Sequence, residues 1–132
     1  MNITVISVGK IKEKYFTAAI DEYSKRLSRF AKLNIIEVAD EKIPDNASEK
    51  EMEQIKEKEG NKILAKLPQN SFVVTLCIEG KEHSSEELAK KIADISMTSS
   101  HITFIIGGSL GLSDTVKSKS ALRLSFGKMT LP

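Results

Sequence analysis

The sequence predicts an α/β fold in which a mostly parallel sheet carries helices on both faces. Short runs rich in β-branched residues alternate along the chain with segments whose apolar residues recur at helical spacing. Several of the strand-like runs are almost continuously apolar, as strands covered on both faces of a parallel sheet are. No repeat or low-complexity linker interrupts this alternation, so residues 1–132 are expected to form one domain.

Five runs are predicted to be strands, four because they are rich in β-branched residues and the fifth, LRLSF, from its place after the last helical segment. They are ITVISV (3–8), LNIIEV (33–38), FVVTLC (72–77), ITFIIG (102–107) and LRLSF (122–126). The second and fifth are less apolar than the other three.

Four segments between these runs are predicted to be helical: residues 13–30, 48–67, 84–96 and, more weakly, 113–121. The second and third begin with a capping-box pattern, Ser48 with Glu51 and Ser84 with Glu87. In the first segment the aromatic residues fall on one stripe, which makes them candidates for the core before candidates for stacking on bases; they are Tyr15, Phe16, Tyr23 and Phe30.

Composition places the chain among soluble globular proteins, since 40% of its residues are hydrophobic and 29% are charged. No apolar run is long enough to span a bilayer, and the amino terminus lacks the basic region and cleavage site of a signal peptide. Cys77 is the only cysteine, which excludes an internal disulfide and a zinc site built from cysteines. We therefore expect a cytoplasmic protein without a membrane partner.

The net charge of +2 is unevenly distributed along the chain. Residues 1–36 hold seven basic against three acidic residues, residues 37–59 four against nine, and residues 60–132 nine against six. A positive face suited to phosphates is one interpretation, with Lys10, Lys12 and Lys14 after the first strand as candidate contacts. Ordinary solvated helix surface explains the same pattern and is favoured by charge alone.

The stretch FIIGGSLGL (104–112) resembles a nucleotide-binding loop but matches neither common pattern. A dinucleotide fingerprint needs a glycine where Ile106 stands, and a P-loop needs a different spacing and a lysine. In a parallel sheet, however, this loop converges with the segments after the third and fifth strands. Their backbone groups and apolar side chains, Leu76, Leu110, Met129 and Leu131, would suit a compact, partly apolar ligand such as an adenosine derivative.

Six stretches, in order and over essentially the whole chain, carry a family resemblance: ITVISVGKIKEKYF, YSKRLSRF, IIEVADEK, LCIEGKEHSSEELA, FIIGGSLGL and LSFGKMTLP. Together they resemble the SPOUT methyltransferases, and within them the RlmH type, which methylates N3 of a pseudouridine in 23S ribosomal RNA of the large subunit. The resemblance implies an α/β fold with a carboxyl-terminal trefoil knot, a homodimer, and S-adenosyl-L-methionine as cofactor. Because the sequence offers a sparse basic patch and no evident general base, we expect assembled ribosomes to be a better substrate than free RNA.

By position, the resemblance implies contacts to the methyl donor from Leu76, from Gly108 and from the final loop, which comprises Gly127, Lys128, Met129, Thr130, Leu131 and Pro132. Members of this family continue from that loop into a further helix that completes the knot. The resemblance therefore implies that the knot is incomplete in a sequence ending at Pro132.

The residues name no catalytic base, and methyl transfer requires no metal. His83 after the third strand could reach the cleft but is more simply an exposed loop residue, and His101 is expected to be structural. Cys77 is read as a small core residue rather than a nucleophile. Two alternatives stay open beside the enzyme: a non-catalytic nucleotide- or RNA-binding module, and an inactive truncated form.

Overall fold

The structure is a computed structural model that describes residues 1–132. Its elements follow the alternation that the sequence predicts, five strands with four helices between them. The strands are β1 (Asn2–Val8), β2 (Lys32–Val38), β3 (Phe72–Glu82), β4 (His101–Ile106) and β5 (Leu122–Ser125). The helices are α1 (Lys14–Leu27), α2 (Glu49–Lys66), α3 (Ser85–Ser96) and α4 (Asp114–Ser118).

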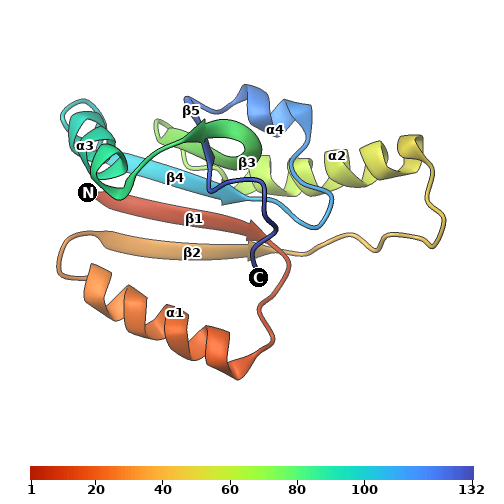
Figure 1. The fold of residues 1–132 in the computed structure, drawn as a ribbon, viewed down its shortest axis with the longest axis horizontal. Coiled ribbons are helices and arrows are strands. Elements are labelled where there is room, and N and C mark those ends of the chain that lie inside the picture. The colour runs from red at the N-terminus through yellow and green to blue at the C-terminus, as the bar shows by residue number, and fades with distance from the viewer.

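All five strands form one parallel sheet in the order β2-β1-β4-β3-β5 (Figure 1). The prediction of a mostly parallel sheet is confirmed, and every strand pair is in fact parallel. Because parallel strands point the same way, their carboxyl ends and the loops that follow them meet at one edge of the sheet.

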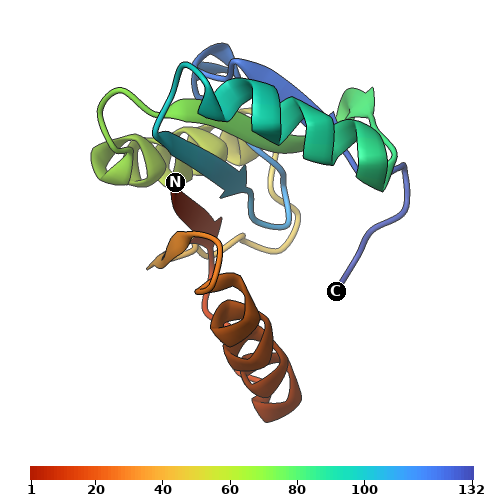
Figure 2. The ribbon, with the colours of Figure 1, turned by 90° about the vertical axis from the view of Figure 1, so that its left-hand side faces the viewer.

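Helices pack on both faces of the sheet, as predicted (Figure 2). Each face has its own apolar core. On one face Ile6 and Ile105 of the sheet pack with Ile63 of α2 and Val116 of α4. On the other face Val74 and Leu124 pack with Ile95 of α3. None of the four helices is long and apolar enough to cross a membrane.

The two predicted capping boxes are both present at helix starts. The Ser48 hydroxyl accepts from the backbone N–H of Glu51, whose carboxylate accepts from the Ser48 N–H, and Ser84 with Glu87 repeats the arrangement in α3. These local contacts satisfy backbone donors that have no partner inside the helix.

Helix α1 differs from the expectation that its aromatic stripe belongs to the core. Tyr15 and Tyr23 are 67% and 64% exposed, Phe16 is half-buried, and no residue of α1 is buried. Phe30 lies in the turn after the helix, which ends at Leu27, and is 77% exposed. The physical reason is the position of α1, which lies beside the edge strand β2 and stands away from the rest of the molecule (Figures 1 and 2). A helix beside an edge strand has few residues of its own chain to pack against, so its apolar side chains stay exposed.

Strand β3 is longer than the predicted run and is irregular at its centre. It pairs with β5 up to Leu76 and again from Lys81, and both residues face Leu124. Residues 77–80 therefore bulge out of the ladder, where the sequence pattern predicts the strand to end at Cys77 and a loop to follow. The bulge reaches the carboxyl edge of the sheet, where Cys77, Ile78 and Glu79 line a hollow.

Candidate functional site

A hollow of about 600 Å³ lies at the carboxyl edge of the sheet. Three segments that are distant in sequence form it: residues 76–79 of β3, the glycine loop 106–112, and the tail from Phe126 to Leu131. Val8, at the end of the neighbouring strand β1, closes it on one side. The convergence of these segments, predicted from the parallel sheet, is confirmed, and the volume falls within the range of about 300–1,000 Å³ typical of small-molecule sites.

Most residues that line the hollow are hydrophobic, and several of their side chains are exposed to solvent. Ile78, Phe126, Met129 and Leu131 are between 59% and 83% exposed. Apolar surface left open to solvent at a concave site is what a partly apolar ligand would cover.

The glycine loop contains a tight turn that only glycine fits at two of its positions. The N–H of Gly111 donates to the carbonyl of Gly108 at 3.0 Å, and Gly111 has a φ of +83°, a conformation that residues with a Cβ rarely adopt. A Cβ on Gly107 would lie 2.9 Å from the backbone carbon of Gly111. The turn therefore requires glycine at these positions, and its backbone can approach a ligand as a consequence.

Gly108 packs against both a neighbouring strand and a buried carboxylate. A Cβ at this position would lie 3.1 Å from Val8 and 3.1 Å from an oxygen of Glu59 on α2. Glu59 is only 5% exposed, and its other oxygen accepts from the N–H of Glu41 at 2.9 Å. Glu59 thus ties helix α2 to the loop after β2, directly behind the floor of the hollow.

The tail is anchored where it leaves β5. Ser125 is buried, and its hydroxyl donates to the carbonyl of Ile78 in the bulge at 3.0 Å. The same oxygen accepts from the N–H of Gly127 at 3.1 Å, and Gly127 has a φ of +110°. Together these contacts turn the chain back toward the hollow, so that the following residues line it.

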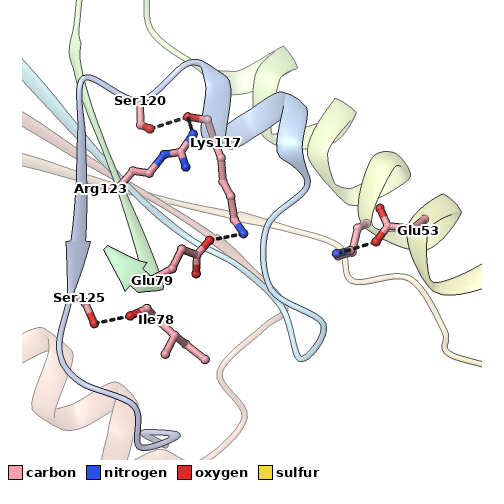
Figure 3. Close-up of polar contacts among 8 residues, drawn as sticks. Glu53, Ile78, Glu79, Lys117, Ser120, Arg123 and Ser125 are labelled. Carbon is pink, nitrogen blue, oxygen red and sulfur yellow. Dashed lines mark hydrogen bonds and ion pairs between the residues drawn. The ribbon is translucent and has the colours of Figure 1, made fainter. Parts of the chain in front are cut away.

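Two charged residues line the hollow, Glu79 from the bulge and Lys117 from α4, and they form an ion pair (Figure 3). The hydrogen bond from Lys117 holds the pKa of the Glu79 carboxyl below its ordinary value, with smaller contributions from its own backbone N–H and from the charge of Arg123. All the other lining residues are uncharged.

The structure brings together most of the residues that the sequence predicts for the site. Seven of them line the hollow: Leu76, Gly108, Leu110, Gly127, Met129, Thr130 and Leu131. Lys128 and Pro132 are exposed and are not among the lining residues, so their contact with a ligand stays a prediction.

The remaining candidates from the sequence lie outside the hollow, with one exception. His83 is half-buried, and its Nδ1 lies 3.2 Å from the carbonyl of Lys81, while His101 lies 2.7 Å from the hydroxyl of Thr4 at the other end of the sheet. Lys10, Lys12 and Lys14 are exposed, and none lines the hollow. Cys77 is the exception: it is half-buried in the bulge and lines the hollow instead of lying in the core.

Sequence reasoning missed the ion pair of Glu79 with Lys117, because the two residues meet only through the bulge. Gly80 was the available signal, since a glycine inside a strand-like run often marks a bulge or a close backbone approach. A Cβ on Gly80 would lie 2.7 Å from the backbone carbon and oxygen of Arg123, so β3 crosses β5 closely at this point.

The parallel sheet and the hollow beside its glycine loop place this chain among the open α/β proteins, whose ligands bind at the carboxyl edge of the sheet. All 132 residues match the family model described as "Predicted SPOUT methyltransferase", and the chain belongs to this family. It is 62% identical to the ribosomal RNA large subunit methyltransferase H of Clostridium botulinum (strain Kyoto / Type A2), over the whole of this chain and 84% of that protein. The proteins of the same name from Clostridioides difficile and Clostridium novyi are 58% and 59% identical over the same shares.

Proposed function

We propose that this protein is an S-adenosylmethionine-dependent methyltransferase that acts on N3 of a pseudouridine in 23S ribosomal RNA, with assembled ribosomes as its substrate. One observation carries the proposal: in a member of the SPOUT methyltransferases, three distant segments enclose one largely apolar hollow at the carboxyl edge of the sheet. The identity of about 60% to ribosomal RNA large subunit methyltransferases supports the substrate class.

The donor set of the hollow fits S-adenosylmethionine, which SPOUT methyltransferases use. Backbone groups of the glycine loop and of the tail can bind the polar edges of an adenosine, while the apolar walls cover its rings. Leu76, Gly108 and residues 127–132 are the proposed contacts. No group of three or more histidine, cysteine or acidic residues could hold a metal ion.

When bound, S-adenosylmethionine would supply its sulfonium methyl group to the imide nitrogen and leave as S-adenosylhomocysteine, while the imide proton would pass to water. The residues of this chain contribute position and the exclusion of water, because a hollow with apolar walls fixes one approach to the reacting carbon. We assign no catalytic base among residues 1–132.

Three further features belong to the proposal. Residues 1–132 act as one methyltransferase domain of a cytoplasmic protein. The tail takes part in a trefoil knot of the SPOUT kind. The functional unit is a homodimer, which would cover the apolar side chains that α1 leaves exposed.

The proposal is tested by binding and by turnover. Titration calorimetry should detect S-adenosylmethionine but neither ATP nor NAD, and ribosomes from cells lacking the modification should gain one methyl group on a pseudouridine, detected by nucleoside mass spectrometry. Free 23S RNA is the comparison substrate, and we expect it to be methylated more slowly than intact ribosomes. Tight binding of ATP with no response to S-adenosylmethionine would overturn the proposal, and binding without turnover on any substrate would favour a non-catalytic module.

A further inference from the structure

We propose that the ion pair of Glu79 with Lys117 is a positioning latch: it holds the bulge of β3 as a wall of the hollow and thereby sets the affinity for S-adenosylmethionine. The inference about affinity rests on the proposed function. The latch itself is a statement about residues 77–80 and α4, and it can be measured without any ligand.

The bulge needs such a contact because the sheet does not hold it. The ladder between β3 and β5 is interrupted between Leu76 and Lys81, both of which face Leu124. Residues 77–80 therefore lack regular pairing with β5, although Cys77, Ile78 and Glu79 line the hollow. A wall of a binding site outside the ladder must be held by other contacts.

The base of the bulge is fixed by close packing and by one hydrogen bond. Gly80 lies so near the backbone of Arg123 that a Cβ would be 2.7 Å from it. The hydroxyl of Ser125 donates to the carbonyl of Ile78 at 3.0 Å, as Figure 3 shows. Both contacts tie the bulge to β5, and neither reaches across the hollow.

The ion pair of Glu79 with Lys117 connects the bulge to α4 and so to the wall that the glycine loop forms. Lys117 lies on α4, the short helix that follows the glycine loop directly, and its ammonium reaches the Glu79 carboxylate (Figure 3). The Arg123 guanidinium donates to the carbonyl of Lys117 at 3.4 Å, so β5 also touches the end of α4. The pair thus joins the bulge to the segment that carries the glycine loop, and fixes the spacing between two walls.

The apolar surroundings of Glu79 and Lys117 favour formation of their ion pair. Glu79 and Lys117 are the charged residues of an otherwise uncharged lining, and the Lys117 side chain is only 19% exposed. Without Glu79, the ammonium would lie against apolar walls with no carboxylate to offset its desolvation. Separation of the walls is therefore opposed as long as both charges are present.

The test uses Glu79→Gln, Lys117→Met and the exchanged double variant Glu79→Lys with Lys117→Glu, with S-adenosylmethionine as the probe in titration calorimetry. Each single variant should bind about three to five times more weakly, the size expected when one half-exposed ion pair is lost. The double variant should recover affinity to within about twofold, because the exchanged charges restore the latch. Hydrogen exchange of the amides of residues 77–80 should be faster in both single variants and normal in the double variant.

The matched control is Glu53→Gln on α2. Glu53 pairs with Lys56 at 2.9 Å, away from the hollow, and the two side chains are 60% and 22% exposed, compared with 51% and 19% for Glu79 and Lys117. This control removes an ion pair of similar exposure, so affinity and the exchange of residues 77–80 should both stay unchanged.

A second probe separates a latch from direct contact with the ligand. Methylthioadenosine shares the adenosine part of the cofactor but lacks its charged amino-acid end. A latch predicts that the single variants weaken both ligands by the same factor. A loss confined to S-adenosylmethionine, a double variant no better than the single ones, or unchanged exchange of residues 77–80 would each overturn the latch. If the unaltered protein bound neither ligand, the proposed function would fail, while the exchange measurement would still decide whether the bulge is held by the pair.

Discussion

At the scale of single residues, three buried threonines of the sheet differ in whether their hydroxyls have a partner. Thr4 lies 2.7 Å from His101, and Thr103 donates to Ser71 at 3.0 Å. The hydroxyl of Thr75, which is fully buried in β3, has none. A buried polar group without a partner reduces stability, because it has lost water and gained nothing in return.

The variant Thr75→Val is therefore expected to stabilise the protein by about 1 kcal/mol. Valine keeps the β-branched shape that suits a strand and removes only the unpaired hydroxyl. The measurement is urea unfolding without ligand, compared with Thr103→Val, which removes a satisfied hydroxyl and should be destabilising. Equal losses in the two variants would mean that Thr75 has a partner in solution.

The Glu79 carboxyl makes stability depend on pH in a defined direction. Its pKa in the folded protein lies below the ordinary value, chiefly because of the hydrogen bond from Lys117. A lowered pKa contributes stability above the ordinary carboxyl pKa, and this contribution is lost as the pH falls through the lowered value. Because half of the side chain is exposed to water, the contribution is expected to be below about 1 kcal/mol.

We accordingly expect Glu79→Gln to lower the free energy of unfolding at pH 7 and to make no difference at a pH below the lowered pKa. Urea unfolding of both proteins across the acid range measures this, with Glu53→Gln as the exposed ion-pair control. The same deficit at every pH would show that the charge of Glu79 is not the cause.

At the scale of secondary-structure elements, the bulge of β3 depends on the absence of a side chain at one position. The variant Gly80→Ala would place a Cβ 2.7 Å from the backbone of Arg123, and backbone cannot move aside as the end of a flexible side chain can. We expect a loss of about 1–3 kcal/mol and faster hydrogen exchange in β5, since the strands must separate to admit the methyl group.

The comparison for this variant is Gly9→Ala, because Gly9 has a φ of +94° but open space around its Cβ position. Strain in the backbone alone should reduce stability by about 1 kcal/mol and should leave the exchange of β5 unchanged. If both variants affected β5 equally, the close crossing of β3 and β5 would not be the reason for the glycine.

The helix starts and the bulge also show which elements a sequence can predict. A capping box is a contact between residues three apart, so Ser48 with Glu51 could be read directly from the sequence. The bulge of β3 depends on how β5, more than 40 residues further along the chain, lies beside it. Its only local sign is Gly80, and the ion pair that follows from it has no local sign at all.

At the scale of the whole molecule, the parallel sheet explains why the convergence of the hollow's segments was predictable and why the packing of α1 was not. Apolar strands alternating with helices imply that strand ends converge, which is enough to bring Leu76, Gly108 and Met129 to one hollow. The aromatic stripe of α1 indicates only that this helix face must be covered, not by what. The stripe does not pack into the core of its own chain, and Tyr15 and Tyr23 stay exposed.

The final prediction follows from that exposed face: the homodimer, if α1 forms part of its interface, should be broken by a charge on the stripe. Leu27 is 41% exposed and lies one helical turn after Tyr23, on the same side of α1. Leu27→Lys would bury an unpaired charge between the subunits, and such a charge is strongly unfavourable in an apolar interface. Sedimentation equilibrium should therefore find a dimer for the unaltered protein and a shift toward monomer, by about tenfold or more in dissociation constant, for the variant.

Asp21→Lys provides the control, because Asp21 is exposed on α1 but lies around the helix from the apolar stripe. It introduces the same lysine and should leave the dimer intact. Loss of the dimer in both variants would point to charge in general rather than to the stripe, and a dimer that survives Leu27→Lys would place the interface elsewhere. A monomer in the unaltered protein would leave the apolar face of α1 without the occupant that we propose for it.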